Sequence, residues 1–211
     1  MWRAAVLAFL LQLGPPPADR VDTAHRDTWQ RPAAVMDGLG IRRGSRVADI
    51  GAGGGYFTFH LAGRVGTTGR VYAVDVQRAA LADIAQRAST ERLTQITTVQ
   101  GTDEDPHLPA RSVDVILVVN TYHEFRAFDS MMQAFRTALK PRGRLAVIEP
   151  EAIAGEPPGR AFRYHRISRS AVRGDAERAG LRFVRNELGF VNPDGGITSS
   201  YWFFLVFERP D

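Results

Sequence analysis

A glycine-rich turn and an aspartate twenty residues beyond it carry the most chemical information in this sequence. The turn covers residues 49–56 (DIGAGGGY), where an apolar β-branched run gives way to a helical pattern. Glycines at such a turn permit positive φ angles and let a ligand approach the backbone. Asp75 ends the next apolar run, where its carboxylate can accept the protons of both ribose hydroxyls. Together these features predict a site for a ligand that contains a nucleoside.

The residues around the turn distinguish between nucleoside ligands. A dinucleotide fingerprint requires glycine or alanine three places after its second glycine, because the helix packs closely there, and Tyr56 occupies that place. A phosphate-binding P-loop requires glycine directly before its lysine, but Leu139 precedes Lys140, the only lysine in the sequence. Arg136 stands where a short-chain dehydrogenase has the tyrosine of its tyrosine–lysine pair. An NAD-dependent oxidoreductase is therefore a disfavoured alternative.

The elements that must position these residues follow from hydrophobic periodicity. Apolar runs typical of strands alternate with amphipathic patterns typical of helices, which predicts parallel strands joined by right-handed crossovers. The predicted strands cover residues 46–50, 71–75, 96–100, 113–119 and 144–148. The predicted helices cover residues 56–65, 78–89 and 128–139. This pattern predicts an open, doubly wound α/β sheet.

Both ends of the sequence depart from that alternation. A helix is predicted over residues 28–39, ahead of the sheet, and another over residues 168–179. Two strands, 181–188 and 201–208, follow without a helix between them, and the turn residues NPDGG in their connection suit an antiparallel hairpin. The predicted fold class is therefore α/β, a Rossmann-like doubly wound seven-stranded sheet, mostly parallel with a C-terminal antiparallel hairpin.

Composition limits the class of protein further. The 211 residues include 20 Gly, 12 Pro and no Cys, which fits one globular domain and excludes disulfides, thiolate metal sites and cysteine nucleophiles. The formal net charge is +4. The arginines between positions 160 and 185 stand singly among acidic residues, which argues against nucleic acid as a partner. No metal site is predicted.

The first 20 residues have the pattern of a signal peptide or of an N-terminal extension. Arg3 precedes the apolar run 4–13, and the sequence GPPPA follows it. The run is too short to span a bilayer, which needs about 20 apolar residues. If residues 1–18 act as a signal peptide, the protein is exported or periplasmic, and otherwise it is cytoplasmic. The globular domain is expected over residues 21–211.

Three segments together resemble the class I S-adenosylmethionine-dependent methyltransferases. Residues 47–55 (VADIGAGGG) resemble the family's first motif, residues 71–75 (VYAVD) its ribose-binding segment, and residues 139–145 (LKPRGRL) its late turn. The resemblance covers roughly residues 28–208 and implies a seven-stranded sheet with a reversed last strand. It also implies S-adenosyl-L-methionine as the cofactor and methyl transfer to an acceptor. We expect a small-molecule acceptor, because no inserted domain is visible.

The resemblance implies a role for each matching position. The acidic residue and glycines of the first motif would hold the methionine end of the cofactor, and the aspartate after the second strand its ribose. Asp103, Glu104 and Asp105 all follow the third strand, where the adenine contact is expected, and we favour Asp103. The cofactor-binding residues expected in this way are Asp49, Gly51, Gly53, Gly55, Asp75, Asp103 and Asn120, the last at the end of the fourth strand.

The acceptor side of the site is expected beyond the fourth and fifth strands. Methyl transfer requires alignment of donor and acceptor, and a base only where the acceptor must lose a proton. His123, with Tyr122 beside it, is the first candidate for a base or an acceptor-orienting group, and His165 is the second. Glu149 and Glu151 could also face the pocket. A non-catalytic S-adenosylmethionine-binding protein stays an alternative, and the sequence indicates neither the acceptor atom nor the oligomeric state.

Overall fold

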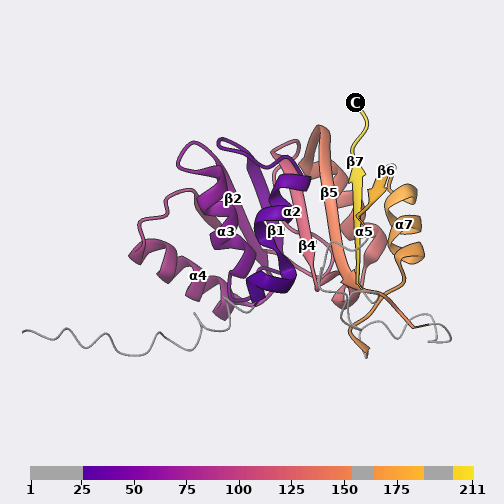
Figure 1. Ribbon diagram of the computed structural model, residues 1–211, viewed down its shortest axis with the longest axis horizontal. Helices are drawn as coiled ribbons and strands as arrows, with labels where there is room; N and C mark the ends of the chain where they lie inside the picture. Colours follow the sequence, from indigo (N-terminus) through magenta and orange to yellow (C-terminus); the bar gives the residue numbers. More distant parts are fainter. Residues whose placement is uncertain (1–25, 154–163, 188–201) are drawn as a thin grey trace, which may run out of the picture.

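A seven-stranded mixed sheet runs through the computed structural model, which describes residues 26–153, 164–187 and 202–211 (Figure 1). The strand order is β3-β2-β1-β4-β5-β7-β6. Strands β1 to β5 are parallel to one another, and β7 pairs antiparallel with both β5 and β6. The strands are β1 (Arg46–Ile50), β2 (Arg70–Asp75), β3 (Ile96–Gln100), β4 (Val113–Val119), β5 (Leu139–Pro150), β6 (Arg182–Asn186) and β7 (Trp202–Glu208).

Helices cover both faces of this sheet (Figure 1). One face is covered by α2 (Pro32–Gly38), α3 (Tyr56–Val65) and α4 (Arg78–Thr90), and the other by α5 (Phe128–Ala138) and α7 (Arg169–Arg178). The central strands are apolar along nearly their whole length because both of their faces are buried. The predicted fold class is confirmed, including the antiparallel C-terminal strands.

The largest differences between the observed and the predicted elements are at two places, and other bounds shift by one or two residues. The expected helix over residues 28–39 is broken at Arg31, which has φ 46° and stands between the helical residues 26–30 and α2. Pro32 has no N–H to continue a helix from the preceding turn, so it begins a new one. The second difference is β5, which begins at Leu139 directly after α5, because Arg142 and Gly143 pair with Arg209 beyond β7.

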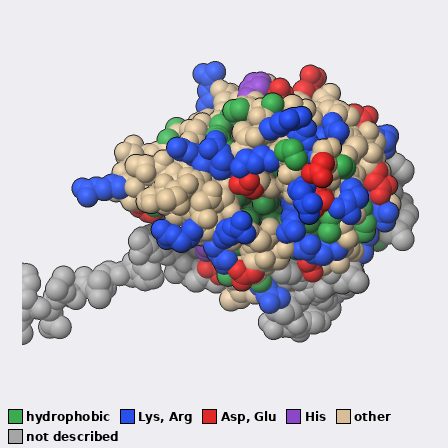
Figure 2. Space-filling view, turned by 90° about the horizontal axis from the view of Figure 1, so that it is seen from above, with side chains coloured by type: hydrophobic (Ala, Val, Ile, Leu, Met, Phe, Trp, Pro, Cys, Tyr) green, Lys and Arg blue, Asp and Glu red, His purple; other side chains and the backbone are tan. Residues whose placement is uncertain are grey.

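The two edges of the sheet have different surfaces. The edge formed by the amino ends of the parallel strands is strongly basic, and Figure 2 shows Lys and Arg side chains spread over this face. A shallow hollow in it is lined by the cationic residues Arg42, Arg43, Lys140, Arg142 and Arg144. The carboxyl ends of the strands meet at the opposite edge, where ligands bind in open α/β sheets.

Several segments for which the sequence gives an expectation lie outside the described residues. These are the segment 1–20, the connection between the last two strands at residues 188–201, and most of the segment after β5, residues 154–163. Among the described residues, none of the helices combines the length and apolar character needed to cross a lipid bilayer.

Candidate functional site

A cavity of about 350 Å³ opens at the carboxyl edge of the sheet. It lies where the strand order reverses, between the ends of β1, β2 and β4, which is the switch point of a doubly wound sheet. Its volume is within the usual range for small-molecule sites. Of the residues expected to bind a cofactor, those that line it are Gly51, Gly53, Asp75, Asp103 and Asn120.

The glycine-rich turn forms one wall of the cavity between β1 and α3. Gly51 has φ 68°, and a Cβ added there would lie 2.2 Å from Cγ2 of Thr121, so only glycine fits at this crossing of the first and fourth strand ends. Gly53 has φ 49°, and a Cβ there would meet no other atom within 4 Å. The backbone at Gly53 is therefore open to a ligand, which is the fit that a nucleoside cofactor requires.

Asp75 is held rigidly at the end of β2. Its Oδ2 accepts a hydrogen bond from the Gly53 N–H at 2.8 Å, and its Oδ1 accepts one from the Gln77 N–H at 2.8 Å. A carboxylate has about four lone-pair positions, so each oxygen keeps capacity for a further donor. The side chain is nearly buried yet lines the cavity, which suits a fixed acceptor for paired hydroxyl groups.

Two of the expected cofactor residues, Asp49 and Gly55, stand behind the cavity wall. Asp49 is 4% exposed, and its Oδ2 accepts a hydrogen bond from Oγ1 of Thr58 at 2.6 Å. Burial raises the pKa of Asp49 from 3.8 to about 6, although the Thr58 hydrogen bond opposes this change. Gly55 is the residue before α3 and has φ 82°. The structure therefore gives both residues a part in shaping the turn.

The loop after β3 presents three acidic residues in different ways. Asp103 lines the cavity, and its Oδ2 lies 3.8 Å from Nε of Arg126, which lines the same cavity. Asp105 instead accepts a hydrogen bond from the His107 N–H through Oδ1 at 2.7 Å, which stabilises the loop. Glu104 is exposed and is absent from the lining. Of the three, only Asp103 is in place to meet a ligand in the cavity.

The turn after β4 is fixed by Glu149, a fully buried residue at the end of β5. Glu149 Oε1 accepts hydrogen bonds from the Thr121 and Tyr122 N–H groups, both at 2.6 Å. Its Oε2 lies 2.6 Å from Nδ1 of His123. Burial raises the pKa of Glu149, while the bond to His123 and the two N–H groups lower it. When Glu149 is ionised it can only accept at this contact, which places the His123 proton on Nδ1.

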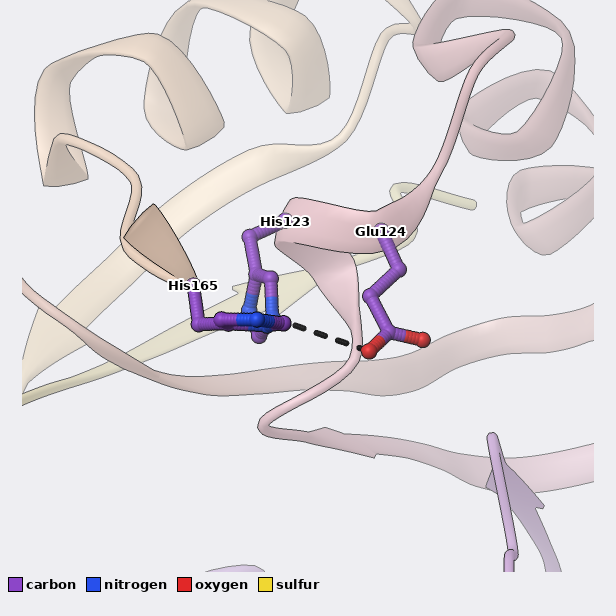
Figure 3. Close-up of side chains that lie close together, drawn as sticks. All are labelled: His123, Glu124 and His165. Carbon is purple, nitrogen blue, oxygen red and sulfur yellow. Dashed lines mark hydrogen bonds and ion pairs between the residues drawn. The ribbon is translucent and has the colours of Figure 1, made fainter. Parts of the chain in front are cut away.

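His123 and His165 lie in contact. The sequence indicates both as candidates for the acceptor side but does not predict this contact. Nε2 of the buried His123 is 3.2 Å from Nδ1 of His165, and the two rings meet edge to face at 88°. Glu124 joins them, with Oε1 3.9 Å from Nε2 of His123 (Figure 3). Glu124 also lines the cavity, so it connects the histidine pair to the space for a ligand.

Tyr122 points into the core and away from the cavity. It is fully buried between Phe125 and Phe128, and its hydroxyl donates a hydrogen bond to Oδ2 of Asp175 at 2.7 Å. Burial, together with the negative charge of Asp175, raises the pKa of Tyr122. The structure therefore places Tyr122 as a link between the loop after β4 and α7.

The site contains two residues that the sequence reasoning did not assign to a role. Glu124 follows His123 directly, and this adjacency is the signal in the sequence that points to it. Glu149 was considered as facing the pocket, whereas it holds the loop from beneath. Glu151, the other residue considered there, accepts a hydrogen bond from the Arg169 N–H at 3.0 Å at the start of α7.

Two histidines of the described chain lie apart from this site. His60 on α3 has Nε2 3.1 Å from Oδ1 of Asp27. His107 has Nδ1 2.8 Å from the carbonyl oxygen of Gln100. Neither lines the cavity, and His25 falls outside the described residues. His123 and His165 do not line the cavity either, and they are connected to it through Glu124.

Comparison with known proteins gives consistent matches. The family model described as "Methyltransferase domain" matches residues 41–173. Nocamycin O-methyltransferase of Saccharothrix syringae is 29% identical over 122 residues, which are 57% of this chain and 44% of that protein. The ubiquinone/menaquinone biosynthesis C-methyltransferase UbiE of Escherichia coli is 29% identical over 160 residues, 71% of this chain and 61% of that protein. The matches thus span between 44% and 61% of the length of these relatives.

A solved structure has the same fold. The crystal structure of a SAM-dependent methyltransferase from Aquifex aeolicus superposes with a TM-score of 0.74, covering 90% of this chain and 96% of that one. The two sequences are 24% identical, so this likeness concerns the architecture. It supports the seven-stranded α/β fold.

Proposed function

The chain belongs to the methyltransferase domain family, and on that premise we propose that it transfers a methyl group from S-adenosylmethionine to a small-molecule acceptor. The observation that carries the proposal is Asp75, which is fixed by the Gly53 N–H and faces a cavity at the switch point of the sheet. The two relatives named above are called an O-methyltransferase and a C-methyltransferase. Their names support a small acceptor for this chain.

The proposed cofactor contacts follow the cavity wall. Asp75 accepts hydrogen bonds from the ribose hydroxyls, Asp103 binds the adenine amino group, and Gly51 and Gly53 border the methionine end with Asn120. Asp49 acts from behind this wall, where its carboxylate attracts the ammonium group of the methionine moiety. The aspartates thus provide negative charge at the places where the cofactor has donors or a positive charge.

These residues act mainly by alignment. When bound, S-adenosylmethionine supplies a methyl group already activated by a positively charged sulfur. The chain's residues therefore need to hold the donor and exclude other orientations, which is a large source of rate enhancement for reactions between two bound partners. Asn120, with φ 53° and its N–H bonded to Ile148 at 2.9 Å, fixes the loop that borders this position.

The acceptor is proposed to bind where Glu124 enters the cavity wall. His123 lies just behind Glu124 with Nδ1 turned to Glu149, so its Nε2 is directed to the side where Glu124 and His165 lie. The side chains of His123 and His165 orient the acceptor there. The buried Glu149 is a positioning residue, because it fixes both the His123 ring and the preceding loop.

The NAD-dependent alternative is disfavoured by Tyr56. Its hydroxyl donates to Oδ1 of Asp27 at 2.5 Å, and its ring packs against His60 and Phe57. A large, anchored side chain thus occupies the place where a dinucleotide fingerprint requires glycine or alanine. The alternative of a non-catalytic binding protein is separated from an enzyme by measuring turnover.

Calorimetric titration of the folded protein with S-adenosylmethionine, and separately with NAD, tests the cofactor. We expect binding of the first and none of the second, and the reverse result would overturn the proposal. Turnover is tested by incubating the protein and cofactor with phenols, quinols and amines and measuring S-adenosylhomocysteine. Cofactor binding without release of S-adenosylhomocysteine above the background, across all three acceptor classes, would favour the binding protein.

A further inference from the structure

Three side chains beside the cavity place metal-ligating atoms close together. His123, His165 and Glu124 each offer one ligand atom, and these three atoms lie within 4.8 Å of one another (Figure 3). The two imidazole nitrogens are 3.2 Å apart. Two nitrogens bound to one tetrahedral Zn²⁺ at about 2.0–2.1 Å lie about 3.3–3.4 Å apart. The histidine pair is thus already at the spacing that a single ion requires.

The longer of the two measured distances within the cluster involves Glu124, whose side chain can move most easily. Oε1 of Glu124 is 3.9 Å from Nε2 of His123, and the Glu124 side chain is 52% exposed. A side-chain rotation of a half-exposed glutamate needs no change in the core. His123, by contrast, is 1% exposed. One ligand is therefore fixed by packing, while the carboxylate can adjust to the ion.

Glu149 supplies the outer hydrogen bond that metal-binding histidines require. A ligating histidine almost always gives its other ring N–H to a carboxylate or a carbonyl, which fixes the ring and raises its basicity. Glu149 Oε2 lies 2.6 Å from Nδ1 of His123, on the side of the ring away from Glu124 and His165. Its Oε1 is held by two N–H groups of the loop that carries His123 and Glu124. The carboxylate–histidine arrangement is therefore complete.

From this geometry we infer that His123, His165 and Glu124 bind one divalent first-row transition metal ion at the rim of the cavity. Imidazole donors favour Zn²⁺ and its neighbours in the series over Mg²⁺ and Ca²⁺, which prefer sets of oxygen ligands. Three protein ligands leave a coordination position open, as in catalytic sites. The sequence did not predict this site, because His123 and His165 are separated by a helix, a strand and a loop.

The position of Glu124 gives the bound ion a role in the proposed reaction. Because Glu124 belongs both to this cluster and to the cavity lining, the open position is next to the space for the acceptor. An acceptor oxygen bound there would lose its proton more easily, since a bound cation lowers the pKa of a ligating hydroxyl. This use of the ion rests on the proposed methyl transfer, whereas binding of the ion does not.

Calorimetric titration with Zn²⁺ tests the site in the untagged full chain, stripped with a chelator and then freed of it. We expect one ion per chain, and a visible absorption band typical of low coordination number when Co²⁺ replaces Zn²⁺. Mg²⁺ at the same concentrations should not compete. His165→Ala and Glu124→Gln should each weaken Zn²⁺ binding by at least about tenfold, and Glu149→Gln by about 10- to 100-fold through the His123 ring.

The controls separate this site from adventitious binding and from misfolding. His60→Gln removes a histidine outside the cluster and should leave Zn²⁺ affinity unchanged. The substitutions at Glu124 and His165 replace exposed side chains, so they keep the test valid if His123→Ala fails to fold, as circular dichroism would reveal. The inference is overturned if the wild type binds no Zn²⁺, or if its affinity is the same after either of these two substitutions.

A titration with S-adenosylmethionine in the presence of chelator keeps the two proposals apart. Cofactor binding without Zn²⁺ binding would remove the metal site and leave methyl transfer in place. Zn²⁺ binding without cofactor binding would remove methyl transfer and leave the metal site in place, and the ion would then have a role other than methyl transfer.

Discussion

Asp49 and Glu149 are ionisable side chains enclosed by the sheet and its helices, at the ends of β1 and β5. Burial of a carboxylate costs free energy unless hydrogen bonds or an opposite charge compensate. Glu149 has three donors around it, whereas Asp49 has the hydroxyl and the backbone N–H of Thr58. Both carboxylates lie behind the residues that line the cavity, and groups with displaced pKa values often lie close to functional sites.

Asp49 should make the protein less stable as the pH rises from about 4 to about 6. Its pKa is 3.8 when unfolded and about 6 when folded, so within this window the folded chain binds more protons than the unfolded one. Stability falls with pH wherever that holds. The two pKa values correspond to about 3 kcal/mol of unfolding free energy, present below pH 4 and lost above pH 6.

Denaturant unfolding of the wild type and of Asp49→Asn across this range isolates the effect. The asparagine keeps an oxygen for the Thr58 hydroxyl but has no proton to lose near pH 6. We expect the difference in unfolding free energy between the two proteins to change through the window, in favour of the variant as the pH rises. Parallel stability curves would show that the Asp49 pKa is not displaced.

Asp75→Asn should weaken S-adenosylmethionine binding by about 1.5–3 kcal/mol, the usual contribution of hydrogen bonds to a charged group. An asparagine side chain has one acceptor oxygen where aspartate has two. The variant therefore loses a hydrogen bond, either from a ribose hydroxyl or from the N–H of Gly53 or Gln77. Calorimetry measures the change. Asp83→Asn, on the exposed side of α4, is the matched control. Unchanged affinity in Asp75→Asn would place the ribose elsewhere.

The residues of the site differ in how well the sequence predicts them. Asp75 and Gly53 could be predicted because a local motif and a fixed spacing place them at neighbouring strand ends. The cluster around His123 could not, because Glu149 and His165 reach it from 26 and 42 positions further along. A distance of that kind depends on packing, which single-sequence patterns do not encode.

At the scale of elements, most boundaries agreed with the sequence because strand and helix periods are local. The bounds of β1, β3, β4 and α3 are those predicted from the apolar runs. The leading helix differs because Pro32 restarts it, and β5 differs because its first residues have partners beyond β7. Where a boundary is set by a remote partner, the local pattern is insufficient.

Tyr122 joins two such elements, the turn after β4 and α7. Tyr122→Phe removes the hydroxyl that donates to Asp175 at 2.7 Å in the core. We expect a loss of about 1–3 kcal/mol in unfolding free energy, since a buried acceptor then lacks a partner. Denaturant unfolding measures it. Full stability together with lost methyl transfer would contradict this and restore a catalytic part for Tyr122.

At the scale of the whole molecule, the topology separates two kinds of surface. The proposed reaction space lies at the carboxyl edge of the sheet, and the cationic hollow at the amino edge. The hollow collects the arginines at positions 42 and 43 and those at the start of β5, about a hundred positions later. These cations form no tract in the sequence, because they meet only in the folded chain.

This separation predicts that charge at the amino edge can change without affecting the cofactor site. The triple variant Arg42→Gln, Arg43→Gln and Arg142→Gln removes three of the cations lining the hollow. We expect it to elute from heparin at lower salt than the wild type, since clustered cations dominate attraction to polyanions. Its affinity for S-adenosylmethionine should not change, because screening in salt weakens charge effects across the width of the sheet.

A second triple variant separates clustering from net charge. Arg87→Gln, Arg173→Gln and Arg182→Gln removes the same total charge from exposed arginines that pair with Glu91, Glu177 and Glu208. It should elute from heparin closer to the wild type, because each of these cations already faces a carboxylate. Equal shifts in both variants would mean that net charge alone governs the attraction. A fall in cofactor affinity confined to the first variant would mean that the two edges of the sheet are coupled.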